Sequence, residues 1–141
     1  MIPIHCKRSI VDILNKSDVK IEKWDTIAIE ASKQCKRSFV TKIEDAMLLN
    51  DLMKTVCDYD LPLIACTESH TKTLKNVLDE HASAKKIICL IGTEGGFINS
   101  EAEMAGKAGC IPVSVGLSIL RIETAAVAIS SILLYAYSLG A

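Results

Sequence analysis

The sequence predicts an α/β protein in which helices cover both faces of a mainly parallel sheet. Apolar runs of strand length at Leu61–Cys66, Ile87–Ile91 and Ile111–Val115 alternate with segments whose apolar residues recur at helical spacing. Glycine-marked turns follow the last two runs directly. Strands that alternate with helices connect in parallel, which places the turns after these strands at one edge of the sheet.

The amino-terminal region predicts a short strand followed by a long helix. The strand is expected at Ile2–Cys6, and the helix at Lys20–Lys36, where apolar residues fall at helical spacing and Ser17 or Asp18 can cap the start. We expect one face of this helix to be buried. Trp24 is interpreted as a core anchor on that face, with stacking on a base as the alternative.

The next region predicts one minor strand, one helix and a first buried parallel strand. Phe39–Ile43 is expected to be a connecting or minor strand. The helix after it would carry Ala46, Leu49, Met53 and Val56 on one face. Leu61–Cys66 is the buried strand, and His70 opens a helix after it. The apolar face of that helix would be formed by Leu74, Val77, Leu78 and His81, with His81 interpreted as a helix-end residue.

The carboxyl-terminal region predicts two further strands and two helices. After Ile87–Ile91, Ser100–Glu103 has the S-x-x-E pattern of a capping box, and Gly109 marks the end of that short helix. Ile111–Val115 follows as a strand, and Ala125–Ala141 as a final apolar helix. This stretch is shorter than the about 20 residues that a membrane span needs. We therefore expect a helix buried on nearly all sides, in the protein or in a dimer interface, and no membrane.

Composition restricts the class of protein. The 141 residues suit one domain, residues 1–141, and 50% hydrophobic content indicates a globular chain. The net charge of −1 gives little general attraction to nucleic acid, so RNA binding would need a local patch or a partner subunit. The six cysteines show no C-x-x-C pair and no metal-ligand spacing. They indicate reduced core residues, a cytoplasmic protein and no metal.

Two glycine-marked loops indicate one ligand pocket at the carboxyl edge of the sheet. They are Gly92–Gly96 and Gly116–Thr124. Neither contains G-x-G-x-x-G or G-x-x-x-x-G-K-[ST], and Glu94 disfavours phosphate, so a neutral or cationic ligand suits them better. The alternative is that both are simply tight turns between a strand and a helix.

Together, these loops resemble the signature loops of the RsmE-type ribosomal RNA uridine N3-methyltransferases of the SPOUT superfamily. The family patterns run roughly I-G-P-E-G-G-F/L-S-x-x-E and L-G-x-x-I-L-R-x-E-T-A. The first is matched by Ile91, Gly92, Glu94, Gly95, Gly96, Phe97 and Glu101, and the second by Gly116, Ile119, Leu120, Arg121, Glu123, Thr124 and Ala125. Thr93 stands where the family has proline. So many matched positions make the resemblance specific.

The resemblance extends to the first strand and helix. The segment from Lys23 to Arg37 is similar to the family helix R/K-W-x-x-I-A-x-E-A-x-x-Q-x-x-R, although Lys36 stands where the family has glycine. The resemblance implies RNA binding by Lys7, Arg8, Gln34, Lys36 and Arg37. The alternative for Lys33, Lys36 and Arg37 is that they are solvated side chains that complement the helix dipole.

The resemblance also implies a trefoil-knotted fold and a pocket for S-adenosylmethionine formed by three loops. The implied cofactor-binding residues are Thr67, Glu68, Ile91, Gly92, Thr93, Gly95, Gly96, Val115, Gly116, Ile119, Leu120, Thr124 and Ala125. The reaction would transfer the methyl group to N3 of a uridine in small-subunit ribosomal RNA.

Arg121 and Glu94 are the candidate catalytic residues. Arg121 would stabilise the uridine anion or contact a phosphate, or it forms a structural ion pair with Glu123 or Glu94. Glu94 is either a base or a carboxylate that holds the loop through backbone amides.

The family has an amino-terminal PUA-like domain, and a first strand and helix, before the point where the resemblance begins. Residues 1–141 would therefore be a single, amino-terminally truncated methyltransferase domain. We expect it to keep the cofactor pocket and form a homodimer through the final helix, but to methylate ribosomal RNA poorly or not at all. Two alternatives remain open, a non-catalytic dimerisation module of the same fold and a Rossmann-type nucleotide-binding domain.

Overall fold

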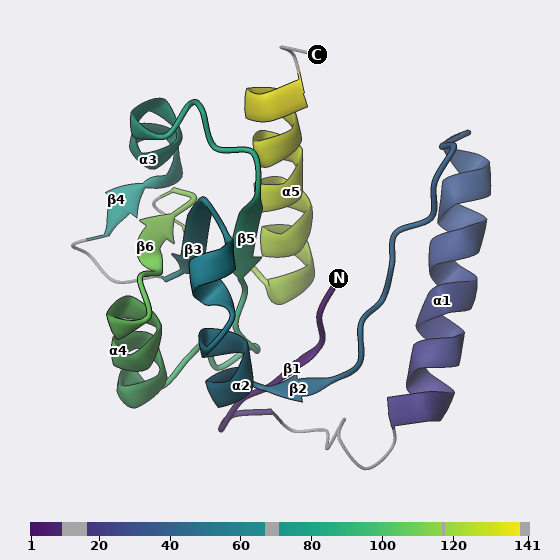
Figure 1. Cartoon of the computed structure of the whole chain (residues 1–141), viewed down its shortest axis with the longest axis horizontal. Helices are drawn as coiled ribbons and strands as arrows, with labels where there is room; N and C mark the ends of the chain where they lie inside the picture. Colours follow the sequence, from purple (N-terminus) through teal and green to yellow (C-terminus); the bar gives the residue numbers. More distant parts are fainter. Residues whose placement is uncertain (10–16, 67–70, 117, 139–141) are drawn as a thin grey trace. The chain divides into compact units, whose positions relative to one another are not determined.

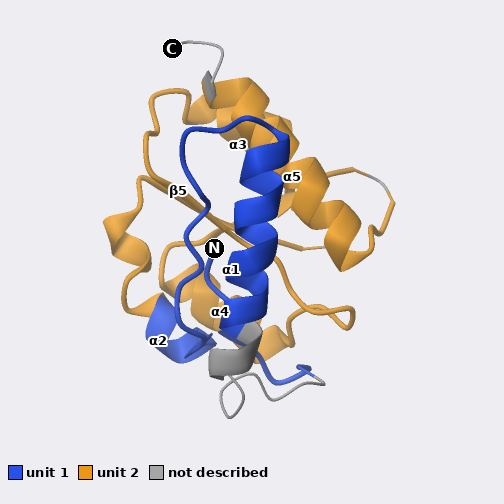
Figure 2. Cartoon of the chain, turned by 90° about the vertical axis from the view of Figure 1, so that its right-hand side faces the viewer, with its two compact units in different colours: residues 1–52 blue, residues 53–141 orange. Residues whose placement is uncertain are grey.

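The computed structural model describes residues 1–9, 17–66, 71–116 and 118–138 (Figure 1). The chain forms two compact units, Met1–Leu52 and Met53–Ala141, which are coloured separately in Figure 2.

The first unit contains a two-stranded parallel sheet and one long helix. The strands are β1 (Ile4–His5) and β2 (Met47–Leu48), with Ile4 opposite Met47, and the helix is α1 (Ser17–Gln34). The expected first strand and long helix are confirmed. The strand expected at Phe39–Ile43 is wrong. Residues that follow this segment pair with the amino-terminal residues instead. The Glu44 N–H donates to the Met1 carbonyl, and the Met47 N–H donates to the Pro3 carbonyl.

The expectation that one face of α1 is buried is only partly met. Ile21, Trp24 and Ala28 are half-buried, whereas Ile27 is 56% exposed and Ile29 is 40% exposed. Trp24 is therefore not a fully enclosed core anchor. The apolar spacing identified the helix correctly, but this unit supplies too few apolar partners to cover it.

Helix α1 ends in a turn that places Lys36 in the left-handed region, at φ 53°. The Arg37 N–H donates to the Ser32 carbonyl at 3.0 Å, and the Lys36 N–H donates to the Lys33 carbonyl at 3.2 Å. This pair of hydrogen bonds is a Schellman motif, in which the left-handed position is usually glycine. Lysine at this position strains the backbone, because its Cβ crowds the following carbonyl.

Substitution Lys36→Gly is therefore expected to raise the free energy of unfolding by about 1 kcal/mol. Urea unfolding measures this change. The control is Lys36→Ala, which removes the charge but keeps the Cβ and should give no comparable gain. An equal gain from alanine would show that charge, and not backbone strain, sets the stability at this position.

The second unit is built on a four-stranded parallel sheet of order β4-β6-β3-β5. Its strands are β3 (Leu61–Ala65), β4 (Lys72–Thr73), β5 (Ile87–Leu90) and β6 (Ile111–Ser114). Its helices are the 3-10 turn η1 (Val56–Asp58), α3 (Leu74–Glu80), α4 (Asn99–Lys107) and α5 (Ile122–Ser138). The predicted α/β class and the parallel sheet are confirmed. The trefoil knot stays a prediction.

Both faces of this sheet are covered. On one face, α3 and α5 pack against the strands, as Figure 1 shows for α5 beside β5. The core on this face consists of Leu61, Leu63, Leu74, Val77, Leu78, Val113 and Ile129. Alternate strand residues point the other way, and there Ile64 is 1% exposed and Leu90 is 2% exposed.

Helix α5 buries one face and leaves another open. Ile129 is 1% exposed, whereas Val127 is 68% exposed and Tyr135 is 73% exposed. The expectation of burial on nearly all sides is therefore wrong within this chain. None of the helices in the described ranges is both long and apolar enough to cross a lipid bilayer.

Three helix starts differ from the sequence expectation. Helix α3 begins at Leu74, capped by Thr73, and not at His70, because Lys72–Thr73 form β4. Between Ala46 and Val56 the chain forms β2, the short helix α2 (Leu49–Met53) and η1 instead of one helix, because its first residues are used in pairing with β1. Helix α4 begins before Ser100, because the Glu101 carboxylate accepts a hydrogen bond from the Ile98 N–H at 3.0 Å. The predicted end of α4 is confirmed, since Gly109 adopts φ 102° just after it.

The cysteines are all free thiols, but not all of them lie in the core. Cys6 and Cys110 are buried and Cys66 and Cys89 are half-buried, whereas Cys35 and Cys57 are exposed. Burial raises the pKa of the Cys89 thiol to about 12. The expectation of six core cysteines is thus wrong for the exposed pair, which lie outside the apolar runs.

Candidate ligand-binding site

Strand register brings the ends of three strands to the same edge of the second unit. β3 lies between β5 and β6, with Ile64 opposite Leu90 and Ala65 opposite Val113. All pairings are parallel, so the segments that leave β3, β5 and β6 start side by side. This arrangement is the one predicted for the glycine loops. The expected residues Thr67 and Glu68, and also His70, lie outside the described residues.

The loop after β5 folds tightly on itself at Gly92. A Cβ placed on Gly92 would lie 3.1 Å from the backbone Cα and C of Gly96 and 3.2 Å from the Phe97 ring. The Gly96 N–H donates to the Thr93 carbonyl at 2.8 Å, and Gly96 has φ 66°. Glycine is needed at the first position for space and at the second for its backbone conformation.

Two side chains of this loop have no hydrogen bond within the described residues. The Thr93 hydroxyl is buried and has no partner there. Glu94 is exposed at the tip of the turn. No bond from its carboxylate to the loop amides occurs in the described chain, so the interpretation that Glu94 shapes the loop finds no support.

The loop after β6 is held by Ser114 and is open beyond Gly116. The Ser114 hydroxyl donates to the Gly116 carbonyl at 2.9 Å and accepts from the Gly116 N–H at 3.3 Å. A Cβ on Gly116 would meet no atom within 4 Å. Val115 and Leu120 are half-buried, and Ile119 is 81% exposed. An isoleucine this exposed leaves an apolar surface available for a ligand or a partner.

Arg121 caps the start of α5. Its carbonyl accepts a hydrogen bond from the Ala125 N–H at 2.8 Å, and its side chain is exposed. Within the described ranges Arg121 forms no ion pair, so the alternative of a structural pair with Glu94 or Glu123 is wrong. Thr124 is exposed and Ala125 is half-buried on the first turn of the helix.

The residues expected to bind RNA belong to the first unit. Lys7 and Arg8 follow β1, while Gln34, Lys36 and Arg37 lie at the end of α1, and all five are exposed. The Arg37 guanidinium lies 5.1 Å from the centre of the Phe39 ring. This contact holds the arginine over an exposed aromatic side chain, an arrangement that also suits stacking on a base.

A surface depression of about 410 Å³, which no sequence pattern predicted, lies at the opposite edge of the second unit's sheet. It is lined by Asp60, Glu80, His81, Ser83, Ala84 and Lys85. Asp60 precedes β3 and Lys85 precedes β5, so the depression lies at the amino ends of the strands, away from the glycine loops.

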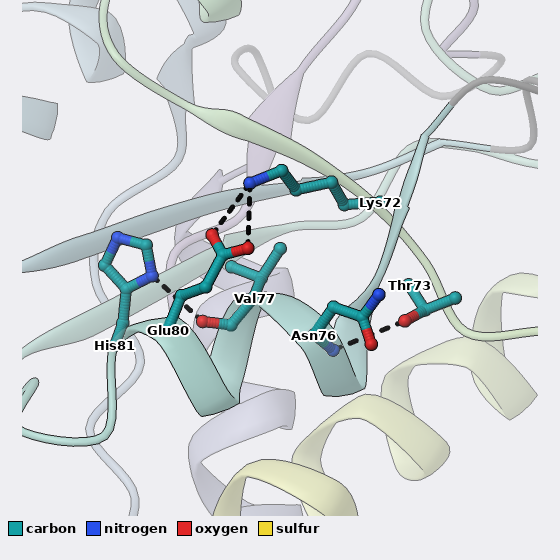
Figure 3. A network of polar contacts seen from close by, with 6 residues as sticks. All are labelled: Lys72, Thr73, Asn76, Val77, Glu80 and His81. Carbon is teal, nitrogen blue, oxygen red and sulfur yellow. Dashed lines mark hydrogen bonds and ion pairs between the residues drawn. The ribbon is translucent and has the colours of Figure 1, made fainter.

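Hydrogen bonds within the chain occupy several groups around this depression. The Lys85 and Lys86 N–H groups donate to the Asp60 carboxylate at 2.9 Å each and lower its pKa. The Glu80 carboxylate pairs with the Lys72 ammonium at 2.7 Å, and the His81 Nδ1 lies 2.9 Å from the Val77 carbonyl (Figure 3). His81 is thus the helix-end residue that the sequence predicts, and these groups stabilise the end of α3.

A parallel sheet covered by helices, with glycine loops at its carboxyl edge, defines an α/β protein of the small-molecule-binding class. Residues 1–134 match the model of a family described as RNA methyltransferase domain. The chain belongs to this family.

Relatives and solved structures agree with this assignment. Ribosomal RNA small subunit methyltransferase E of Buchnera aphidicola (subsp. Acyrthosiphon pisum) is 37% identical over 77% of this chain and 41% of its own length. The Bacillus subtilis protein of the same name is 28% identical over 88% of this chain and 50% of its length. The Legionella pneumophila methyltransferase Lpg2936, solved with bound SAM, superposes with a TM-score of 0.85 at 29% identity, over 95% of this chain and 54% of the other. The chain therefore spans about half the length of these proteins.

Proposed function

We propose that this chain is an S-adenosylmethionine-dependent methyltransferase acting on N3 of a uridine in small-subunit ribosomal RNA. The observation that carries the proposal is the convergence of the β5 and β6 loops at one sheet edge, in a chain of the RNA methyltransferase family. Relatives named for methylation of small-subunit ribosomal RNA, and a similar structure with bound SAM, support the same substrate and cofactor.

The residues of the two loops fit an adenosyl group. A side chain on Gly92 would collide with the backbone of Gly96, and a side chain on Gly116 would fill open space. Both glycines therefore let a ligand approach the backbone. Ile119 and Leu120 add apolar surface, which suits the face of a purine. We assign cofactor binding to the predicted set, Thr67, Glu68, Ile91, Gly92, Thr93, Gly95, Gly96, Val115, Gly116, Ile119, Leu120, Thr124 and Ala125. When bound, the sulfonium supplies an already activated methyl group.

Arg121 and Glu94 are the residues that we assign to the chemistry. Arg121 places a guanidinium, which has no ion pair among the described residues, at the start of the 17-residue helix α5, where the helix dipole also favours negative charge. Both effects would stabilise the uracil anion as the N3 proton leaves. Glu94 carries an exposed carboxylate with no hydrogen bond in the described chain, so it can accept that proton, directly or through water.

RNA binding is assigned to the first unit. Its exposed side chains Lys7, Arg8, Gln34, Lys36 and Arg37 offer charge, amide groups and a guanidinium beside an aromatic ring. These residues lie at two separate places of the first unit, after β1 and at the carboxyl end of α1 (Figure 1). Because the whole chain has a net charge of −1, such local groups of side chains have to supply the attraction to phosphate. The family model runs through both units, which supports treating residues 1–141 as one methyltransferase domain. Ribosomal RNA as the substrate would place the protein in the cytoplasm.

Homodimer formation through α5 accounts for its open face. Val127, Leu134 and Tyr135 are 68%, 51% and 73% exposed, and their spacing puts them on one side of the helix. An apolar stripe of this kind is typical of a surface that a second subunit covers.

Substitution Leu134→Glu is therefore expected to shift the chain from dimer to monomer, because it places a charge in the centre of the stripe. Sedimentation equilibrium measures the mass. Ala136→Glu is the control, because Ala136 is exposed but lies away from the stripe. A wild-type chain that is already monomeric at all concentrations would contradict the proposed dimer.

Calorimetric titration with S-adenosylmethionine, followed by single-turnover methylation of small-subunit RNA, tests the proposed function. We expect binding of S-adenosylmethionine and methyl transfer to uridine N3. Absence of binding heat, with no effect of substitutions at Gly92 or Gly116, would favour the non-catalytic module. Preference for NAD or ATP would favour the nucleotide-binding alternative.

A further inference from the structure

The hydroxyl of Thr93 is a buried polar group that the described chain does not use. It lies in the loop after β5, where the Thr93 carbonyl accepts the Gly96 N–H but the side-chain Oγ1 has no hydrogen-bond partner. Nearly all buried polar groups in proteins are hydrogen-bonded, so an orphan of this kind calls for an explanation. A buried hydroxyl without a partner destabilises the state that contains it.

Backbone atoms hold the tight turn between Gly92 and Gly96, and the turn makes no use of the Thr93 hydroxyl. Since the side chain makes no hydrogen bond, turning the hydroxyl toward a ligand breaks none.

The surroundings of Thr93 favour a neutral ligand group. Within residues 91–98 the single charged side chain is Glu94, whose carboxylate would repel an anionic group. Gly92 and Phe97 are in close contact beside it, and the open, apolar loop after β6 starts from the same sheet edge. An uncharged nucleoside with donors and acceptors meets these conditions, whereas Glu94 would repel the carboxylate at the amino-acid end of S-adenosylmethionine.

We propose that the Thr93 hydroxyl forms a hydrogen bond with the adenosine part of the bound cofactor, and so acts as a specificity residue. This inference rests on the proposed function. Removal of the hydroxyl should therefore weaken cofactor binding but stabilise the ligand-free chain, because the same hydroxyl destabilises the ligand-free chain and stabilises the complex.

The test compares the full chain with its Thr93→Val and Thr93→Ser variants. Valine keeps the shape and removes the hydroxyl, whereas serine keeps the hydroxyl. Calorimetric titration should give a Kd for S-adenosylmethionine about 5- to 30-fold higher in Thr93→Val and close to wild type in Thr93→Ser. In the absence of ligand, Thr93→Val should melt at the same temperature as wild type or about 3 °C higher.

The ligand 5′-methylthioadenosine, which lacks the amino-acid end, locates the contact. The valine substitution should weaken its binding by the same factor. A valine penalty confined to S-adenosylmethionine would overturn the assignment to adenosine, and equal affinities of wild type and Thr93→Val would overturn the hydrogen bond itself. A lower melting temperature in Thr93→Val would show that the hydroxyl is structural.

Thr41→Val is the matched control, because Thr41 is an exposed threonine of the first unit. It should change neither affinity nor melting temperature. If the wild-type chain gives no heat with S-adenosylmethionine, the proposed function has failed. If wild type binds and the valine variant binds equally well, only the inference about Thr93 has failed.

Discussion

Replacement of Arg121 by alanine is expected to lower the single-turnover rate of methyl transfer by about 10²- to 10³-fold, with the Kd for S-adenosylmethionine nearly unchanged. The reason is that negative charge develops on uracil only as N3 loses its proton. The Arg121 guanidinium lies at the amino end of α5 and has no ion pair in the described part of the chain. It stabilises that charge more than it stabilises the neutral base.

The rate constant at saturating RNA separates this role from a phosphate contact. If Arg121 contacts phosphate, Arg121→Ala raises the RNA concentration needed for half-maximal rate and leaves the maximal rate unchanged. Arg121→Lys keeps the charge but loses the planar fork of donors, so its rate should fall between those of wild type and alanine. A parallel rise of the S-adenosylmethionine Kd in Arg121→Ala would instead place this residue in the cofactor site.

The sequence predicted the second unit well because hydrophobic periodicity and burial coincide there. Leu61–Ala65 and Ile87–Leu90 are apolar runs in strands with covered faces, and the structure confirms both. β4 was not predicted, because Lys72–Thr73 are polar and exposed and join the sheet through backbone hydrogen bonds to β6 alone. Such a strand leaves no hydrophobic signal.

The candidate site was predictable in position but not in detail. Glycine turns after apolar runs indicated which sheet edge carries the loops, since the α/β pattern makes the strands parallel and brings their carboxyl ends to one edge. Periodicity cannot indicate whether a polar side chain finds a partner. The unpaired Arg121 and the buried Thr93 hydroxyl depend on packing distances of a few tenths of an ångström, as does the crowding at Gly92. These features required the structure.

Substitution Gly92→Val is expected to raise the Kd for S-adenosylmethionine by about 10- to 100-fold. The first added carbon alone would lie 3.1 Å from two backbone atoms of Gly96, and backbone cannot turn aside as a flexible side chain can. The loop must therefore open, which moves Thr93 and Glu94 together. Because this loop lines the proposed pocket, its displacement should lower the affinity for S-adenosylmethionine more than it lowers the stability of the fold. Calorimetric titration and thermal unfolding measure the two effects.

Two other glycine substitutions test whether the glycine loops bind the ligand or only form tight turns. A Cβ on Gly116 or on Gly106 meets no atom within 4 Å, so neither alanine substitution should disturb the fold. Gly106→Ala lies inside α4 and should stabilise the chain by about 0.5–1 kcal/mol with no effect on binding. Gly116→Ala should weaken S-adenosylmethionine binding at unchanged stability, because its methyl group would occupy space that we assign to the ligand. If Gly116→Ala binds like wild type while Gly92→Val unfolds the chain, the glycines serve the turns alone and the pocket lies elsewhere.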